Sequence, residues 1–128
     1  MTQVTTLGRV LVPVADQDQA IAFYTQMLGF TLTADVPFGN GDRWVEVTPP
    51  GGGAAIALTT PQGQYQPGRM TGISLGSADA RADHAELSGQ GVDVDAEMWG
   101  GDGNVPLGFF LRDQDKNQLM MVQDFPQP

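Results

Sequence analysis

The side chains of this sequence best suited to act on another molecule are an arginine, a glutamate and several large aromatics. Trp44 and Glu46 are two residues apart in the segment RWVEVT, and an extended strand places residues at this spacing on one face. A glutamate can serve as a general base, and an arginine can stabilise developing negative charge. Glu46 and Arg9 are therefore the pair that an enzyme would use, although the sequence alone assigns no catalytic residue.

Other chemically capable residues are better explained by structural roles. The single histidine, His84, falls on the apolar face of an expected helix, where histidines more often pack than catalyse. Asp113 and Asp115 lie in the polar stretch RDQDKN, where aspartates commonly accept hydrogen bonds from nearby backbone. The chain has no cysteine, which excludes disulfides, thiolate metal sites and thiol nucleophiles.

The length and the net charge of the chain exclude several classes of protein. The 128 residues are enough for one domain with a hydrophobic core. Six basic and fifteen acidic residues give a net charge of -9, which disfavours a nucleic-acid partner and attracts cations. The N-terminus does not read as a signal peptide, and no apolar stretch reaches membrane-spanning length, so we expect a cytoplasmic protein with no membrane partner.

Two similar runs of elements must position these side chains. In the first run, valines alternate from Val10, as in a strand. From Asp16, which can cap a helix, the apolar residues have helical spacing, and Gly29 can end this helix. In the second, alternation begins at Ile73, Ser77 is the expected helix cap, and Gly89 or Gly91 ends the helix. Three strand candidates follow each helix: FTLTAD, RWVEVT and AAIALTT in the first run, and VDVDAE, PLGFFLR and NQLMMVQ in the second.

This order predicts an α+β fold built from two βαβββ modules. Module one is expected at about residues 7–60, a connector at 61–69 and module two at about 70–124, all within one domain over residues 1–128. A single module cannot bury both faces of its sheet, so a second copy must cover the open one. The sequence leaves open whether that copy comes from the same chain or from a partner that exchanges modules.

Four motifs carry a resemblance to a known family. They are V-x-D before the first helix, AFYTQMLGF, RW-x-x-V, and the ending RDQDKNQLMMVQ, which is similar to F-x-D-P-D-G-N-x-L-E-L. From about Arg9 to Gln123 the chain resembles the vicinal oxygen chelate superfamily of glyoxalases, bleomycin-resistance proteins, fosfomycin-resistance enzymes and extradiol dioxygenases. The resemblance implies a curved mixed sheet around a central cavity.

The same resemblance bears on metal binding. Metal-dependent members carry four ligands, typically His, Gln or Glu, on the first and fourth strands of both modules. The matching positions here hold Arg9, Ala57, Gly72 and Met120. Catalytic divalent ions require imidazole or carboxylate ligands, so we expect no metal and no cofactor, and a metal-dependent glyoxalase or dioxygenase is disfavoured.

Strand alternation predicts which side chains face the cavity. The consistently apolar positions should pack on the helices, which turns the opposite positions inward. The segment GFFLR is apolar on both faces, and we place Phe110 inward. With aromatics from the expected loops, the predicted ligand-binding residues are Arg9, Phe38, Trp44, Glu46, Tyr65, Trp99, Phe110 and Met120.

These observations favour a metal-independent protein that binds a small organic molecule, aromatic or cationic, such as one that sequesters an antibiotic. The alternative is a metal-free lyase, isomerase or hydrolase that uses Glu46 and Arg9, and turnover of a ligand would distinguish the two. Related two-module chains commonly pair, so we expect a homodimer. The sequence does not identify the ligand.

Overall fold

The computed structural model describes residues 1–125, which form two compact units, one ending at Pro67 and one beginning at Gly68. This boundary falls inside the expected connector at residues 61–69. Each unit is described by itself below.

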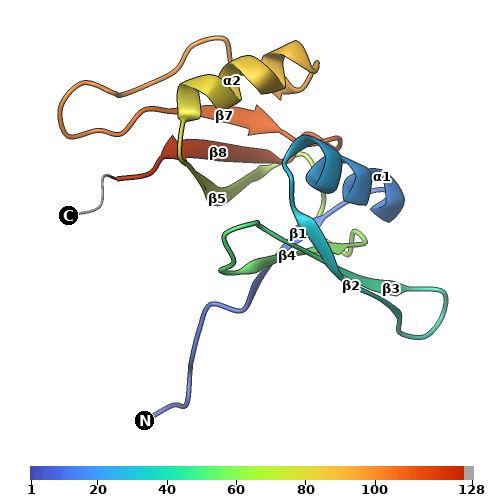
Figure 1. Cartoon of the computed structure of the whole chain (residues 1–128). Coiled ribbons are helices and arrows are strands. Elements are labelled where there is room, and N and C mark those ends of the chain that lie inside the picture. The colour runs from blue at the N-terminus through green and yellow to red at the C-terminus, as the bar shows by residue number, and fades with distance from the viewer. Residues whose placement is uncertain (126–128) are drawn as a thin grey trace. The chain divides into compact units, whose positions relative to one another are not determined.

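The first unit is a four-stranded mixed sheet with one helical segment (Figure 1). In the sheet order β1-β4-β3-β2, β1 is parallel to β4 and the other neighbours are antiparallel. Its elements are β1 (Arg9–Pro13), α1 (Gln17–Ala22), a π-helical turn η1 (Phe23–Met27), β2 (Thr31–Pro37), β3 (Arg43–Thr48) and β4 (Ala55–Thr59).

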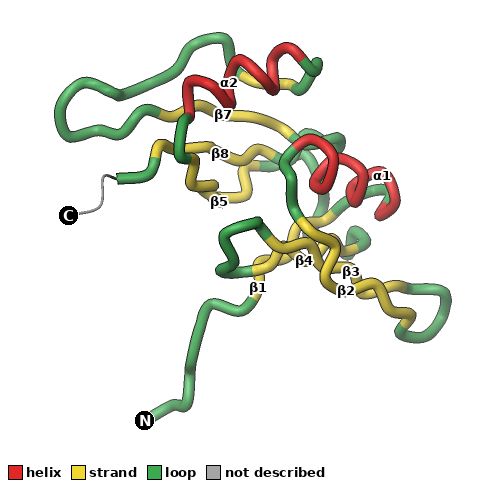
Figure 2. The backbone as a smooth tube through the Cα atoms, in the orientation of Figure 1, coloured by secondary structure: helices red, strands yellow, loops and turns green. Residues whose placement is uncertain are grey.

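The second unit repeats this topology in the sheet order β5-β8-β7-β6. Its α2 lies along one face of the sheet (Figures 1 and 2). The elements are β5 (Met70–Ser77), α2 (Ala80–Gly89), β6 (Asp93–Val94), β7 (Gly108–Arg112) and β8 (Gln118–Gln123). The predicted α+β fold of two βαβββ modules is confirmed.

The two helices begin at aspartates. The side chain of Asp16 accepts a hydrogen bond from the Gln19 amide at 3.1 Å, as predicted. The second cap is Asp79, whose carboxylate accepts from the Ala82 amide at 3.0 Å, so the prediction of Ser77 was wrong. Ser77 is the last residue of β5, and its hydroxyl instead accepts from the Asp79 amide and donates to Asp83.

The core of each unit lies on the helix-facing side of its sheet. Most of the predicted apolar positions are buried there, including Val12, Val45 and Leu58 in the first unit and Leu119 and Met121 in the second. Val10, Ile73 and Leu75 are only half-buried. Alternation therefore predicted the buried face of most strands in both sheets.

One predicted strand is much shorter than expected. The segment VDVDAE contributes only the two residues of β6, although the Asp95 amide still donates to the Phe110 carbonyl at 3.0 Å. The Asp95 carbonyl contacts His84 Nε2 at 2.7 Å, and the Asp95 carboxylate accepts from Arg112 at 2.7 Å. Over residues 1–125, neither helix has the length and apolarity needed to cross a lipid bilayer.

Candidate ligand-binding surfaces

The eight predicted binding residues are divided between the two units. Arg9, Phe38, Trp44, Glu46 and Tyr65 belong to the first unit. Trp99, Phe110 and Met120 belong to the second unit. We call these groups the first and second aromatic surfaces.

An ion pair crosses the sheet of the first unit. Arg9 lies on β1 and Glu46 on β3, and β4 runs between these two strands. On this face β4 presents Ala55 and Ala57, which are opposite Arg9 and Glu46 in the strand register. These small side chains allow the Arg9 guanidinium to reach the Glu46 carboxylate, with 2.8 Å between Nε and Oε2.

Glu46 is the centre of this polar group. Its Oε2 also accepts a hydrogen bond from the indole Nε1 of Trp44 at 2.6 Å. The Glu46 side chain is only 14% exposed, whereas that of Arg9 is 51% exposed. Two donors therefore hold one carboxylate oxygen, and the opposite charges of Arg9 and Glu46 balance each other on this face.

Aromatic rings extend the first aromatic surface from Trp44. The Phe38 ring packs edge-on against Trp44 at a centroid distance of 6.3 Å, and Phe38 is largely exposed. Val36 is directly opposite Trp44 in the register and is also exposed. The Tyr65 hydroxyl donates a hydrogen bond to the carbonyl of Leu11, which lies on the edge strand β1. Burial raises the pKa of the Tyr65 phenol.

Val36 was not among the predicted residues. A bulge between Leu32 and Ala34 shifts the register of β2, so simple alternation along this strand does not give its faces. The polarity of the sequence carries no clear signal for such a bulge. Only the observed pairing with Trp44 places Val36 on the first aromatic surface.

The second aromatic surface is built around an indole that lies against the backbone. Phe110 is directly opposite Met120 in the β7–β8 register, so both lie on one face, as predicted. Trp99 packs on Phe110 at a centroid distance of 4.7 Å and pairs with Gly108 through two backbone hydrogen bonds. A Cβ at Gly108 would be 2.6 Å from Cζ2 of Trp99, so the absence of a side chain there allows this contact.

The four positions that hold metal ligands in related enzymes do not fit a divalent cation. Arg9 is positively charged and bound to Glu46, and Ala57 is fully buried. Gly72 has a φ of +76°, a backbone conformation that strains most residues with a side chain, and it lies at a register shift in β5. Met120 offers only a thioether, a soft ligand. Within residues 1–125, no three His, Asp or Glu side chains are grouped to hold a metal.

We therefore expect the purified protein to carry no stoichiometric divalent metal and to gain no thermal stability from zinc, nickel, manganese or iron. The reason is the chemistry of the four side chains above. Elemental analysis combined with melting curves checks this. About one tightly bound metal per chain would contradict both this expectation and the assignment of the inward face.

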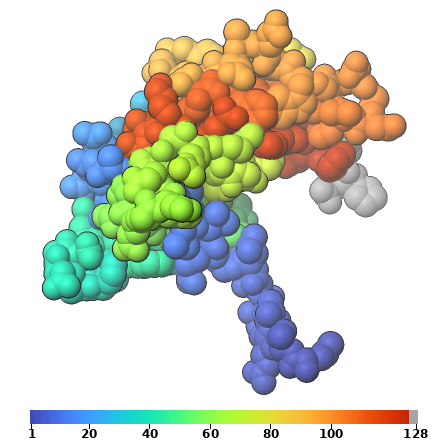
Figure 3. All heavy atoms as spheres, turned by 180° about the vertical axis from the view of Figure 1, so that it is seen from behind, coloured from blue at the N-terminus to red at the C-terminus, as the bar shows by residue number. Residues whose placement is uncertain are grey.

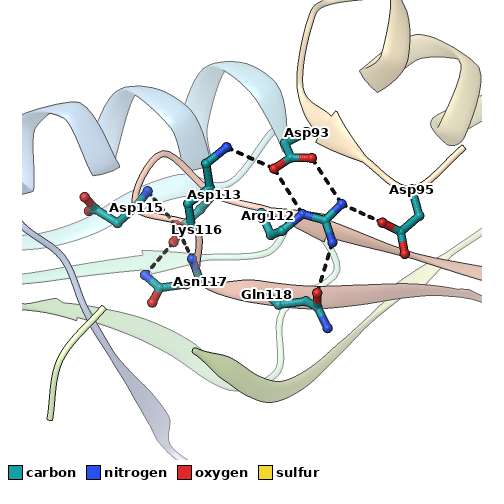
Figure 4. A network of polar contacts seen from close by, with 8 residues as sticks. All are labelled: Asp93, Asp95, Arg112, Asp113, Asp115, Lys116, Asn117 and Gln118. Atoms are coloured by element: carbon teal, nitrogen blue, oxygen red, sulfur yellow. Dashed lines mark hydrogen bonds and ion pairs between the residues drawn. The ribbon is translucent and has the colours of Figure 1, made fainter. Parts of the chain in front are cut away.

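The contacts of His84, Asp113 and Asp115 agree with the structural roles predicted for them. The His84 ring packs edge-on against Phe109 at 4.9 Å. Asp113 Oδ1 accepts from the amides of Asp115 and Asn117, and its Oδ2 accepts from the Asn117 side chain (Figure 4).

Beside the turn that contains Asp113, Arg112 joins Asp93, Asp95 and Gln118 in a partly exposed polar network (Figure 4). Arg112 and Lys116 hold the pKa of Asp93 below its usual range, and Asp93 in turn raises the pKa of Arg112. These residues hold β6, β7 and β8 together. Arg112 and Gln118 are directly opposite each other in the β7–β8 register and lie on the same face as Phe110 and Met120.

Comparisons with known proteins agree with this geometry. The model of the Glyoxalase/Bleomycin resistance protein/Dioxygenase superfamily matches residues 6–121. The chain is 31% identical to TnmS3, an antibiotic binding protein from Streptomyces sp. CB03234, over 98% of this chain and 100% of that one, with a TM-score of 0.83. A superfamily member from Sphaerobacter thermophilus is 28% identical over 96% of this chain and 100% of that one, with a TM-score of 0.88.

A shorter match is to the uncharacterized protein YetH of Bacillus subtilis (strain 168). It is 38% identical over 52 residues, which is 41% of this chain and 43% of that protein. This match therefore spans less than half the length of YetH.

Proposed function

Since the chain belongs to the Glyoxalase/Bleomycin resistance protein/Dioxygenase superfamily, we propose that it binds a small organic molecule without a metal ion. The observation that carries this proposal is the first aromatic surface, where Trp44 and Phe38 adjoin the Arg9–Glu46 pair. Aromatic walls with a few fixed polar groups are typical of small-molecule sites. The similarity to TnmS3, an antibiotic binding protein, supports an antibiotic as the ligand.

The chemistry of the first aromatic surface favours a planar or amphipathic ligand. The Trp44 indole and the exposed Phe38 ring supply area for stacking against an aromatic system. Arg9 and Glu46 supply a donor and an acceptor for polar atoms at the ligand's edge, and their charges cancel locally. The net charge of -9 acts at longer range and favours the approach of a cation.

The second aromatic surface offers a similar set of groups. Trp99 and Phe110 are packed together, and Met120 adds a flexible apolar side chain that adapts to irregular ligand shapes. We propose that Tyr65, whose hydroxyl is held by Leu11, belongs to the binding surface of the first unit, and that the second unit offers Trp99, Phe110 and Met120 as a binding surface of its own.

The enzyme alternative, with Glu46 as base, has less support. In this structure Oε2 of Glu46 is occupied by hydrogen bonds from Arg9 and Trp44. That arrangement suits a fixed acceptor that orients the ligand better than a base that must approach a substrate proton. Recovery of a chemically unchanged ligand after prolonged incubation with the protein would support binding alone.

A thermal-shift screen tests the proposed function. Each compound of a panel of planar, cationic and neutral antibiotics and aromatic metabolites is added to protein treated with EDTA. A ligand at about 100 times its Kd stabilises the folded state by about 2.7 kcal/mol. At least one planar compound should raise the Tm, and the rise should persist in EDTA.

We also expect the protein to be a homodimer. The first unit exposes the apolar side chains of Val4, Leu7 and Leu32, and a second copy of the chain would remove apolar area of this kind from water. Light scattering should report twice the chain mass of 13.6 kDa. A strictly monomeric species at tens of micromolar would contradict the prediction.

A further inference from the structure

Three neighbouring strands, β5, β8 and β7, form the sheet face that carries the second aromatic surface. Residues that are directly opposite one another make rows across this face, and two adjacent rows are Ser74–Met120–Phe110 and Gly76–Val122–Gly108. Leu119 and Met121, which alternate with Met120 and Val122, are buried in the core, so the two rows lie on the face away from α2. The second row has a glycine at each end.

The indole of Trp99 lies over one of these two glycines. A Cβ at Gly108 would be 2.6 Å from Cζ2 and 2.8 Å from Cε2 of Trp99. The indole also packs on Phe110 of the neighbouring row, at a centroid distance of 4.7 Å. Among aromatic rings, an indole attracts a cation to its face most strongly.

The carboxylate of Asp124 lies over the other glycine. A Cβ at Gly76 would be 2.5 Å from Oδ1 of Asp124. The backbone fixes this position, because the Asp124 amide donates to the Ser77 carbonyl at 2.8 Å. Figure 3 shows the end of β8, in red, beside the loop that precedes β7, in orange. A carboxylate and an indole therefore stand at the two ends of one row.

The charge of Asp124 is not balanced on this face. Arg112 also lies here, where it forms ion pairs with Asp93 and Asp95. Lys116 pairs with Asp93 as well, so two cations balance two carboxylates in that network. The Asp124 carboxylate is exposed and makes no hydrogen bond or ion pair with any residue from 1 to 125. The face therefore carries one surplus negative charge beside its aromatic rings.

The spacing of the row suits a single cation. Gly76 and Gly108 are two strands apart, which is about 10 Å. An ammonium nitrogen at about 2.8 Å from a carboxylate oxygen forms a charge-assisted hydrogen bond, and a cation within about 6 Å of a ring centroid is attracted to that ring. These two distances together nearly span the row, so one cation over Val122 can contact both Asp124 and Trp99.

We propose that this face binds an organic ammonium cation that carries an apolar or aromatic group. Asp124 accepts a hydrogen bond from the ammonium group, and the indole of Trp99 contacts the same cation. The attached group packs on Met120 and Phe110. This inference rests on the part of the proposed function that makes the second aromatic surface a binding surface, and it adds the charge of the ligand and the residue that selects it.

An NMR titration of the full-length protein labelled with ¹⁵N at pH 7 tests this inference. The probes are three phenyl compounds of similar size: 2-phenylethylamine, a cation at this pH, 2-phenylethanol, which is neutral, and 3-phenylpropionate, an anion. The cation should shift the indole N–H signal of Trp99 and the amides of residues 76, 120, 122 and 124 saturably. The alcohol should bind about three- to tenfold more weakly, because it lacks one exposed charged contact, and the anion should bind most weakly.

Matched variants assign the charge. Asp124→Asn should weaken binding of 2-phenylethylamine by about three- to tenfold and leave binding of 2-phenylethanol unchanged. Glu86→Gln is the control, because it removes the same charge from an exposed position of α2, on the other side of the sheet. Gly76→Ala keeps the charge but should also weaken binding of the cation, since its Cβ displaces the Asp124 carboxylate. The same spectra show whether each variant is folded.

The indole signals of Trp44 and Trp99, assigned with Trp44→Phe, report on the two aromatic surfaces separately. Equal binding of 2-phenylethylamine and 2-phenylethanol at Trp99, or equal affinities of Asp124→Asn and Glu86→Gln for the cation, would overturn the inference and leave the second aromatic surface as a binding surface. An unchanged Trp99 signal at about 20 mM of each probe, well above a millimolar Kd, would overturn both. The first aromatic surface is then still judged by the Trp44 signal.

Discussion

Replacing Trp44 with alanine is expected to weaken binding of the organic ligand by about 1 to 3 kcal/mol, or roughly 5- to 150-fold in Kd. The indole is the central ring of the first aromatic surface, in contact with Phe38 and hydrogen-bonded to Glu46. Alanine removes the stacking area and also leaves Glu46 without one of its two donors. Isothermal titration of a compound found in the thermal-shift screen measures the loss.

Trp44→Phe separates these two effects. Phenylalanine keeps a ring for stacking but cannot donate to Glu46, so its affinity should lie between those of the parent and Trp44→Ala. Trp99→Ala reports on the second aromatic surface in the same way. If Trp44→Ala and Trp99→Ala both bind the ligand as tightly as the parent protein, the aromatic surfaces do not form its site.

Asp113→Ala is expected to lower the free energy of unfolding by about 2 to 4 kcal/mol. Asp113 is 3% exposed and accepts hydrogen bonds from the Asp115 amide, the Asn117 amide and the Asn117 side chain. Alanine leaves these donors without their acceptor. The Asn117 side chain in the same turn also accepts a hydrogen bond from the Gly68 amide. Urea denaturation monitored by circular dichroism measures the change.

Asp102→Ala is the matched control, because it makes the same chemical change at an exposed position without a side-chain partner among residues 1–125. It should change the free energy of unfolding by no more than about 0.5 kcal/mol. Equal effects of the two substitutions would show that the Asp113 contacts contribute little to stability.

The sequence was sufficient to predict the repeated βαβββ order and the faces of most strands. Alternation of Val12 with Leu11, and of Leu119 with Met120, reflects which side of each sheet packs on its helix. The inward placement of Phe110 needed an additional choice, because both faces of GFFLR are apolar. Its register opposite Met120 agrees with that choice.

Several features of the candidate site depend on three-dimensional contacts that alternation does not encode. The Arg9–Glu46 pair requires that β4 lie between β1 and β3 with alanines on the same face. Val36 joins Trp44 only because β2 contains a bulge. The contact of Trp99 with Gly108 depends on how the preceding loop returns to β7.

The helix caps and the loops were also difficult to predict from the sequence. Ser77 and Asp79 can both cap a helix, and the extent of β5 decides between them. The loop before β7 depends on positive φ at Gly100 and Gly101, and glycine alone does not specify its own conformation. Sequence patterns of polarity therefore predicted the sheets better than the loops between them.

A fluorescence titration of metal-free protein most directly tests metal-independent binding on the first aromatic surface. In Trp99→Phe, Trp44 is the only tryptophan, so its emission reports on this surface alone. After EDTA treatment, a planar ligand from the thermal-shift screen should change this emission saturably, with the same Kd before and after zinc or manganese is added. Binding that appears only with the added metal, or that leaves the Trp44 emission unchanged, would contradict the account.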